Sequence, residues 1–227
     1  MLAQRYPDLY NGIHASAPAV DWARLIPSFA WPQIYMNINQ QFPFPCELDA
    51  LTKAAIAACD PLDGVTDGLV SDPHACNFDP FSLVGHPINC SGTGKISFEA
   101  ASVANITWQG PVSSTGEVLW PGPYSQAQIT GTPGLANTTC TNNGTCTGVP
   151  IGLGETWLQL FVQKDPSWSY LDVSSVNEYE RLFKEGAQQY RSSIDTSEPD
   201  LSRFRDGGGK LISYHGMVRE LCNRVML

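Results

Sequence analysis

Apolar residues recur at helical spacing in three segments, which are 48–58, 155–163 and about 174–189. In the first segment, one helix face carries Leu48, Leu51, Ala55 and Ala58. In the second, the apolar side chains are Trp157, Leu158 and Phe161. In the third, the pattern predicts a cap at Ser175 and a buried stripe of Tyr179, Leu182 and Phe183. Shorter helices are predicted at residues 1–6 and 96–105.

Two short apolar runs near opposite ends of the chain are typical of buried strands. The run 10–19 is entered by a turn and ended by Pro18, and the run 211–216 has a glycine at each end. A parallel strand that is covered on both faces typically has a short, uninterrupted run of apolar residues. Because almost the whole chain separates the two runs, the sequence predicts an α/β sheet interrupted by a large insertion.

The segment 108–150 is rich in Gly, Thr, Asn and Pro and shows little periodicity, so it predicts loops or irregular β structure held by disulfides. The segment 23–38, directly after Trp22, contains Phe29 and Trp31. These aromatic side chains could line a pocket, but ordinary packing in the core is the favoured alternative for any single one.

The composition excludes two classes of partner. Of the 227 residues, 42% are hydrophobic, which is enough for one large domain or a domain with a sizeable insertion. The net charge is −9, and the 13 basic residues form no cluster that would neutralise phosphates, so no nucleic-acid partner is expected. No apolar run reaches the length of a membrane span, so no membrane partner is expected either.

Cysteines and glycosylation motifs indicate an oxidising secretory compartment. The seven cysteines are Cys46, Cys59, Cys76, Cys90, Cys140, Cys146 and Cys222. The four N-glycosylation sequons begin at Asn89, Asn105, Asn137 and Asn143. The pairing cannot be deduced from sequence, but proximity along the chain favours Cys46–Cys59, Cys76–Cys90 and Cys140–Cys146, with Cys222 left over. The first residues lack the features of a signal peptide, so we expect the natural N-terminus to lie elsewhere.

The run 59–73 places three carboxylates close together, those of Asp60, Asp63 and Asp67. Glycine follows Asp63 and Asp67 and allows the chain to turn sharply at each. Calcium takes six to eight oxygen ligands, so we predict one Ca²⁺ held by these three carboxylates and the carbonyls of Val65 and Leu69. The spacing differs from that of an EF-hand, and the alternative interpretation is two Asp-Gly turns on a solvated loop.

Five segments together resemble the fungal tannase and feruloyl esterase family, namely 3–8, 12–19, 59–73, 77–80 and 208–216. The resemblance implies an α/β-hydrolase with a large lid domain inserted in the sheet, a calcium site on the lid loop, and a Ser-Asp-His triad that cleaves esters of aromatic acids. The expected partner is therefore a small aromatic ester, or a plant cell-wall or tannin ester. The parent protein is expected to be secreted.

The resemblance also divides the chain. Residues 1–38 correspond to a fragment of the hydrolase core, 39–202 to the lid with its calcium loop, 203–217 to a returning core strand, and 218–227 to a tail unlike the family. We interpret the tail as translated intron or frame-shifted sequence, which would account for Cys222.

No position of the triad has a matching residue. The serine would precede Leu2, the acid position holds Arg219 with Glu220 one residue out of register, and the histidine would follow Leu227. No catalytic residue is therefore assigned, and the chain alone is expected to have no useful esterase turnover. His215 is expected to be a hydrogen-bonded histidine outside the triad.

Two alternatives stay open. The chain could be a non-catalytic, calcium-stabilised module that binds phenolic or cell-wall ligands through exposed Trp and Tyr side chains. It could also be the product of a faulty gene model without function.

Overall fold

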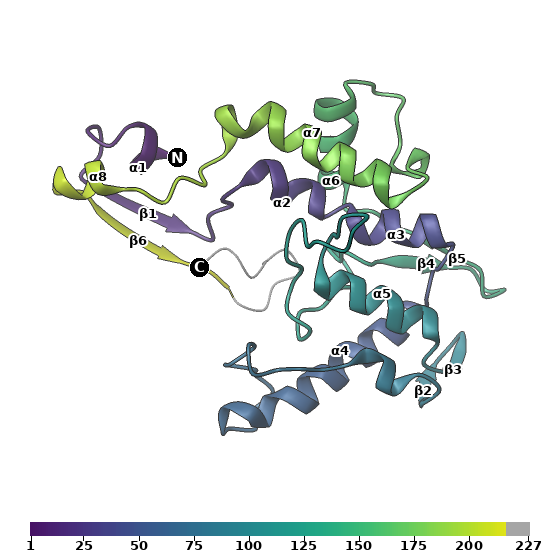
Figure 1. The fold of residues 1–227 in the computed structure, drawn as a ribbon. Helices are drawn as coiled ribbons and strands as arrows, with labels where there is room; N and C mark the ends of the chain where they lie inside the picture. The colour runs from purple at the N-terminus through teal and green to yellow at the C-terminus, as the bar shows by residue number, and fades with distance from the viewer. Residues whose placement is uncertain (217–227) are drawn as a thin grey trace.

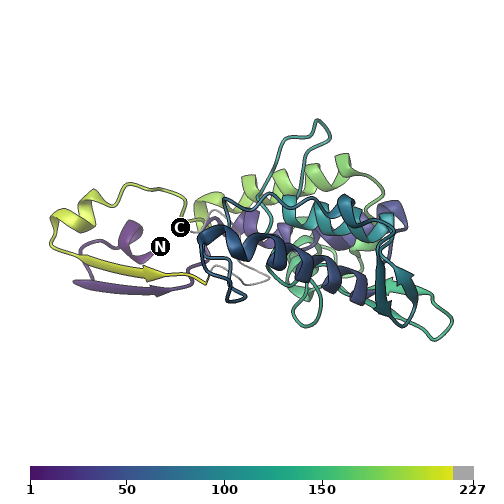
Figure 2. The same ribbon diagram turned by 90° about the horizontal axis from the view of Figure 1, so that it is seen from below.

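The computed structural model describes residues 1–216. Cys222 and the segment 218–227 lie outside these residues. A parallel strand pair, β1 (Gly12–Ser16) and β6 (Lys210–Tyr214), lies at one end of the molecule beside α1 (Leu2–Arg5) and α8 (Ser202–Asp206) (Figure 1). The register runs from Gly12 opposite Lys210 to Ser16 opposite Tyr214. A larger helical body occupies the other end (Figure 2).

The helical body contains the remaining elements. Its helices are α2 (Trp22–Ser28), α3 (Trp31–Asn39), α4 (Pro45–Cys59), α5 (Phe98–Gln109), α6 (Gly152–Thr156) and α7 (Val176–Ile194). Two antiparallel hairpins accompany them, β2 (Pro87–Cys90) with β3 (Thr93–Lys95) and β4 (Thr138–Cys140) with β5 (Cys146–Gly148). A π-helical segment, Trp157–Gln163, continues α6, and 3-10 turns lie at Asp60–Asp63, Pro80–Leu83 and Tyr170–Asp172.

Two hydrophobic clusters form the core of the body. The first joins α2, α3 and α7, and the rings of Trp31 and Tyr179 lie 5.0 Å apart in it. The second joins α4 and α5 around Leu48 and Val103. A buried carboxylate connects these last two helices, because Glu47 accepts hydrogen bonds from the amides of Phe44 at 3.0 Å and Ser97 at 2.8 Å.

The helical pattern of the sequence is largely confirmed. Ser175 caps α7 by accepting a hydrogen bond from the Glu178 amide, and the predicted stripe of Tyr179, Leu182 and Phe183 is buried. Phe29 and Trp31 are core residues rather than pocket walls. Of the predicted apolar face of α4, Leu48, Leu51 and Ala55 are buried, but Ala58 is exposed and Cys59 is buried instead.

The two predicted strands exist and are parallel, but the prediction that both are buried is wrong. Every residue of β6 is exposed, including Ile212 at 67%, and β1 alternates between exposed and half-buried residues. Among the described residues these two strands pair only with each other. Within residues 1–216 the sheet therefore has two open edges, and the two short helices α1 and α8 both lie on one side of it (Figure 2).

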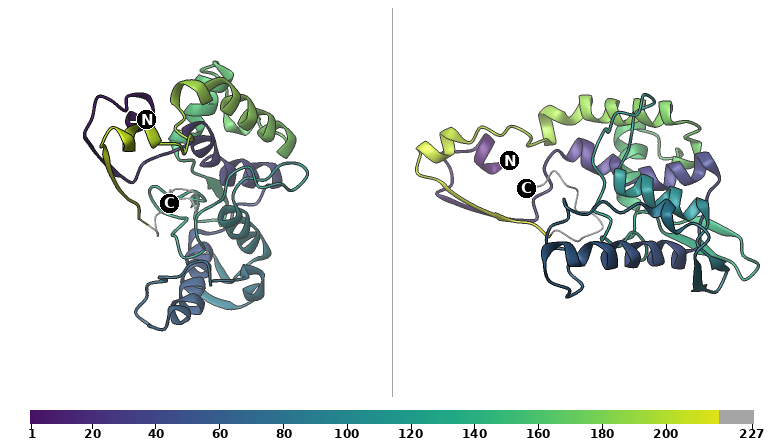
Figure 3. Two further views of the ribbon diagram at one scale, coloured as in Figure 1. Left: turned by 60° about the vertical axis from the view of Figure 1, so that its left-hand side comes forward. Right: turned by 60° about the horizontal axis from the view of Figure 1, so that its bottom comes forward.

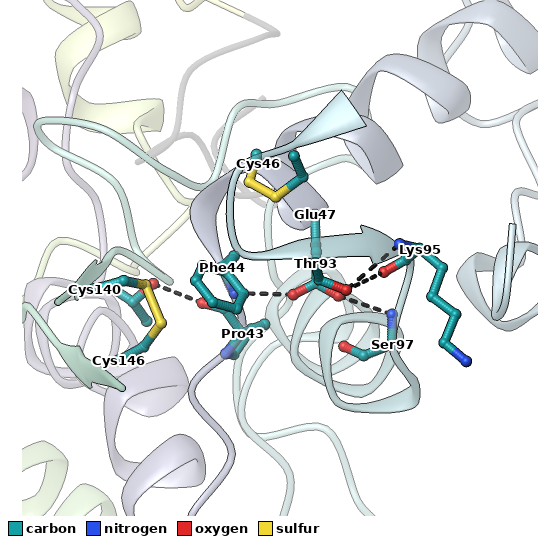
Figure 4. The surroundings of a disulfide bond; sticks show 11 residues. Pro43, Phe44, Cys46, Glu47, Thr93, Lys95, Ser97, Cys140 and Cys146 are labelled. Atoms are coloured by element: carbon teal, nitrogen blue, oxygen red, sulfur yellow. Dashed lines mark hydrogen bonds between the residues drawn. A yellow bond between two sulfur atoms is a disulfide. The ribbon is translucent and has the colours of Figure 1, made fainter. Parts of the chain in front are cut away.

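Two of the three predicted disulfides are wrong. The bonds are Cys46–Cys90, Cys59–Cys76 and Cys140–Cys146, and only the last agrees with the prediction. Cys46 and Cys59 lie at the two ends of α4, which puts them roughly 20 Å apart at 1.5 Å per residue. A disulfide requires Cα atoms within about 7 Å, so these two cysteines cannot meet. Instead, the Cys46–Cys90 disulfide joins the start of α4 to β2, and Cys46 lies near Glu47 (Figure 4).

The described residues include no helix that is both long enough and apolar enough to cross a bilayer.

Candidate functional site

The carboxyl ends of β1 and β6 point toward the helical body (Figure 1). In parallel sheets, ligands bind in the crevice outside the carboxyl ends of the strands. At this end the Ser16 hydroxyl donates a hydrogen bond of 2.5 Å to the Tyr214 hydroxyl, and the Ala17 amide donates to the Tyr214 carbonyl at 2.8 Å. The junction between strand pair and body is therefore the first candidate for a binding site.

The loop from β1 to α2 has an uncommon backbone. Ala17 and Asp21 have φ values of 47° and 51°, in the left-handed region that residues other than glycine rarely adopt. Such conformations persist where the surrounding structure holds them, and they occur often at ligand sites. The loop that leaves the carboxyl end of β1 is thus held in a defined shape.

An apolar cavity lies beside this loop. Its volume is about 310 Å³, and its walls are Met1, Pro18, Ala19, Val20, Trp22, Ile194 and Thr196. Small-molecule sites are mostly apolar with a few polar groups, and this volume is at the lower end of their usual range. The cavity therefore suits a small, largely apolar ligand.

Helix α1 is attached to the end of α7 by polar contacts. The Gln4 amide donates to the Thr196 carbonyl at 2.8 Å, and the Arg5 guanidinium donates to the carbonyls of Ser193 at 2.7 Å and Ser192 at 2.9 Å. The last carbonyls of a helix lack partners within it, and a cation there is stabilised by the helix dipole. These contacts hold the strand pair and the body together beside the cavity.

Two acidic residues meet at the same junction. The Asp195 carboxylate accepts a 2.9 Å hydrogen bond from the Ala23 amide and is 7% exposed. Burial, together with the hydrogen bond that protonated Asp21 donates to the Asp195 carboxylate and the charge of Asp195, raises the pKa of Asp21 to about 6. The cations Arg24 and Arg191 lower this pKa in part, and the Arg24 guanidinium lies 3.8 Å from the Asp21 carboxylate. No motif in the sequence indicated this pair.

The predicted calcium loop has the turns that the sequence suggested. Gly64 and Gly68 have φ values of 93° and 85°, which only glycine adopts without strain. The buried Asp60 carboxylate accepts hydrogen bonds from the amides of Asp67 at 3.2 Å and Gly68 at 3.0 Å. The disulfide Cys59–Cys76 closes the loop.

The other carboxylates of this loop also turn back to its own amides. Asp63 accepts from Val65 at 3.1 Å and Ser71 at 2.7 Å, which lowers the pKa of Asp63, and Asp67 accepts from Leu69 at 3.0 Å. Within residues 1–216, no three Asp, Glu, His or Cys side chains lie close enough together to hold a metal ion. The donor chemistry suits calcium, but the carboxylates are not gathered at one centre, and the five-ligand set stays a prediction.

The side chains of two histidines and two serines form hydrogen bonds, and none of these bonds joins a histidine to a serine. His74 shares a 3.1 Å hydrogen bond with the Tyr124 hydroxyl, and His215 shares one of 3.0 Å with the Gly216 carbonyl. Ser28 donates to the Leu25 carbonyl, as Ser16 donates to Tyr214. His215 is hydrogen-bonded as predicted and lies at the end of β6. We assign no catalytic residue among these groups.

Comparison with known sequences identifies the family. The model of the family described as "Tannase and feruloyl esterase" matches residues 1–221. The chain belongs to the tannase and feruloyl esterase family. A probable feruloyl esterase of Arthroderma benhamiae is 38% identical over 223 residues, covering 96% of this chain and 40% of that protein. The tannase of Aspergillus oryzae is 29% identical over 256 residues, covering 94% of this chain and 42% of that protein.

Solved structures of tannases and feruloyl esterases share the fold. The tannin acyl hydrolase from Aspergillus niger superposes with a TM-score of 0.87 at 26% identity, covering 98% of this chain and 42% of that one. Feruloyl esterase B from Aspergillus oryzae superposes with a TM-score of 0.77 at 24% identity. The chain thus spans about two fifths of the length of these relatives.

Proposed function

We propose that this chain forms part of a secreted carboxylic ester hydrolase that acts on aromatic-acid esters of the tannin or feruloyl type. The single observation that carries the proposal is the apolar cavity beside the carboxyl end of β1, which Trp22 helps to line. Relatives of the chain are named feruloyl esterase and tannase. An aromatic acyl group would fit this apolar cavity, and it is consistent with the names of these relatives.

The proposal assigns roles to the parts of the chain. Residues 1–38 and 203–217 belong to the core of an α/β-hydrolase and supply its β1 and β6, and residues 39–202 form its lid, against which α2 and α3 pack. Two connections join the strand pair to the helical body, the loop after β1 and the segment between α7 and α8 (Figure 3). This arrangement supports an insertion that leaves a sheet after one strand and returns to it at the neighbouring strand.

The residues of this chain bind and orient the ester substrate, and they do not take part in the chemical step. Pro18, Trp22 and Ile194 provide apolar walls, which exclude water from one face of an aromatic acyl group. The nucleophile, the base and its acidic partner would come from outside residues 1–227. Because triad members act as a unit, binding without them supports only residual catalysis.

The proposed enzyme also binds calcium and folds in an oxidising compartment. Three disulfides among the described residues are typical of a secreted protein. Calcium would be held by Asp60, Asp63 and Asp67 with the carbonyls of Val65 and Leu69, and would tie this loop together. For that to happen, the carboxylates must turn toward one centre, where lone pairs that their amide hydrogen bonds leave free would bind the ion.

The test is equilibrium binding of methyl ferulate to the purified chain, with product analysis in the same samples. We expect saturable binding, weaker binding by Trp22→Ala, and no hydrolysis. Phe161→Ala is the control, because Phe161 is 45% exposed on the π-helical segment and does not line the cavity. Equal affinity in Trp22→Ala and the unmodified chain would overturn the cavity assignment. Retained binding to a feruloylated polysaccharide would then favour the non-catalytic module.

A further inference from the structure

The four N-glycosylation sequons differ sharply in their exposure. In Asn143-Gly144-Thr145 all three residues are exposed, and they form the turn of the β4–β5 hairpin. Asn137 and Asn105 are half-buried, and Asn89 is exposed but precedes Cys90, which is bonded to Cys46. A sequon receives a glycan where its asparagine is accessible on a surface loop. Among the four, the Asn143 sequon meets this requirement at all three residues.

The Asn143 turn is held in one shape by local contacts. The disulfide Cys140–Cys146 closes it, and the Thr141 amide donates a 2.9 Å hydrogen bond to the Thr145 carbonyl. Gly144 has a φ of 86° and donates its amide to the Thr141 carbonyl at 3.0 Å. The Thr141 hydroxyl donates to the Asn143 amide oxygen. Within the described residues no acceptor binds the Asn143 amide nitrogen, which faces solvent.

The base of the same hairpin is fixed to the body. The buried Thr138 hydroxyl donates to the Pro43 carbonyl at 2.7 Å, and Figure 4 shows Pro43 near the Cys140–Cys146 bridge. The tip lies at the end of the body away from the strand pair (Figures 1 and 2). A glycan on Asn143 would therefore leave the cavity at the β1–α2 loop uncovered.

Asn137 is half-buried against the body, whereas Asn143 is exposed. Its carbonyl accepts hydrogen bonds from the Gln33 side chain and the Val149 amide, both at 2.9 Å, and its side-chain oxygen accepts from the Gly131 amide at 3.3 Å. These contacts hold Asn137 against the body, beside the buried Gln33. A large sugar on the half-buried Asn137 side chain would have to lie against this part of the body.

Asn105 is held in regular structure. It lies within α5, two residues before Thr107, whose hydroxyl is buried and donates to the Val103 carbonyl at 2.7 Å. The hydroxyl of this sequon is therefore committed to the helix in the folded protein.

We propose that Asn143 carries an N-linked glycan and that Asn105 and Asn137 do not. This inference rests on the secretory part of the proposed function and not on its ester chemistry. The donor is a lipid diphosphate-linked oligosaccharide. The Asn143 amide nitrogen forms a bond to the anomeric carbon, the bond from that carbon to the diphosphate oxygen breaks, the lipid diphosphate leaves with the electron pair, and the nitrogen loses one proton. No oxidant or reductant is needed.

The test expresses the full chain behind a cleavable secretion leader in a eukaryotic host. Glycopeptides from medium and cell extract are treated with peptide N-glycosidase in ¹⁸O-water, which removes each glycan and marks each occupied asparagine as labelled aspartate. We expect the label at Asn143 and none at Asn105 or Asn137. Unlabelled Asn143, or label at Asn137 or Asn105, would overturn the proposal.

Variants on the same hairpin separate glycan loss from misfolding. Asn143→Gln and Thr145→Ala each destroy the sequon and are expected to abolish one glycan's mobility shift. Thr147→Ala is the matched control, because Thr147 is exposed on β5 and belongs to no sequon. Retention of the shift in Asn143→Gln would count against the proposal. Occupancy is read by mass, so a failure of ester binding would leave this result unchanged.

Discussion

The carboxyl groups of Asp21 and Asp195 share a hydrogen bond at the junction between the strand pair and the helical body. Asp21 directly precedes α2, and Asp195 directly follows α7. Both connections between the two parts of the molecule therefore pass through this pair. Two carboxylates in contact cannot both be charged without repulsion, so the pair favours holding one proton.

The first prediction concerns the pH dependence of stability. The pKa of Asp21 in the folded protein is about 6, above the value of 3.8 for an unperturbed aspartate. Between these values the folded state retains a proton that the unfolded state has lost. This contribution to the free energy of unfolding is therefore present below pH 4 and is lost as the pH rises to 6. Thermal unfolding measured from pH 4 to 7 should show this decrease.

Two variants test the origin of that decrease. Asp21→Asn removes the repulsion and should flatten the dependence between pH 4 and 6. Glu99→Gln, at an exposed position on α5, should preserve it. An unchanged slope in Asp21→Asn would show that another group is responsible.

The second prediction concerns calcium. Titration calorimetry of the folded chain should show one calcium site, and Asp60→Asn should weaken it at least tenfold, because a charged ligand becomes neutral. Asp72→Asn is the control, since Asp72 follows the proposed ligands and binds the amides of His74 and Ala75 instead. Absence of any calcium-dependent heat in the folded, disulfide-bonded chain would remove the proposed site.

The third prediction compares two tyrosine hydroxyls. The Tyr179 hydroxyl is buried and donates to the Pro27 carbonyl at 3.0 Å, which joins α7 to α2. Tyr179→Phe should lower the free energy of unfolding by about 1 kcal/mol, because a buried hydrogen bond is lost, although the Pro27 carbonyl keeps the bond from the Ala30 amide. Tyr190→Phe removes a 2.9 Å bond to the Phe161 carbonyl at a more exposed site and should cost under about 0.5 kcal/mol. Denaturant unfolding measures both, and equal losses would contradict the explanation by burial.

The fourth prediction concerns a buried amide. The Gln33 side-chain nitrogen lies 2.9–3.2 Å from the carbonyls of Leu135, Asn137 and Val149, and Gln33 is 1% exposed. Gln33→Ala should cost about 2–3 kcal/mol, because the carbonyls of Leu135 and Val149 lose this donor, while the Asn137 carbonyl keeps the Val149 amide. Gln33→Glu, which keeps the shape but replaces the donor with an oxygen, should be at least as destabilising. A stable Gln33→Glu protein would show that shape, and not donation, holds the β4–β5 region.

Some features of the molecule follow from short stretches of sequence. The buried stripe of α7 and its cap at Ser175 depend on spacing within one helix. The sharp turns at Gly64 and Gly68 depend on glycine's freedom at positive φ. Such properties need only neighbouring residues, and the sequence predicted them together with the family.

Other features depend on contacts between distant segments, and only the tertiary structure decided them. Because α4 is a rigid helix with Cys46 and Cys59 at its two ends, these cysteines cannot meet. They pair with Cys90 and Cys76 instead. The exposure of β1 and β6 depends on which elements cover them, and strand patterns alone cannot state this. The contact between Asp21 and Asp195 arises because α2 and α7 pack side by side. The sequence by itself therefore determined the local conformations and the family. Packing between segments decided the disulfide pairing, the exposed sequon and the acidic pair at the junction.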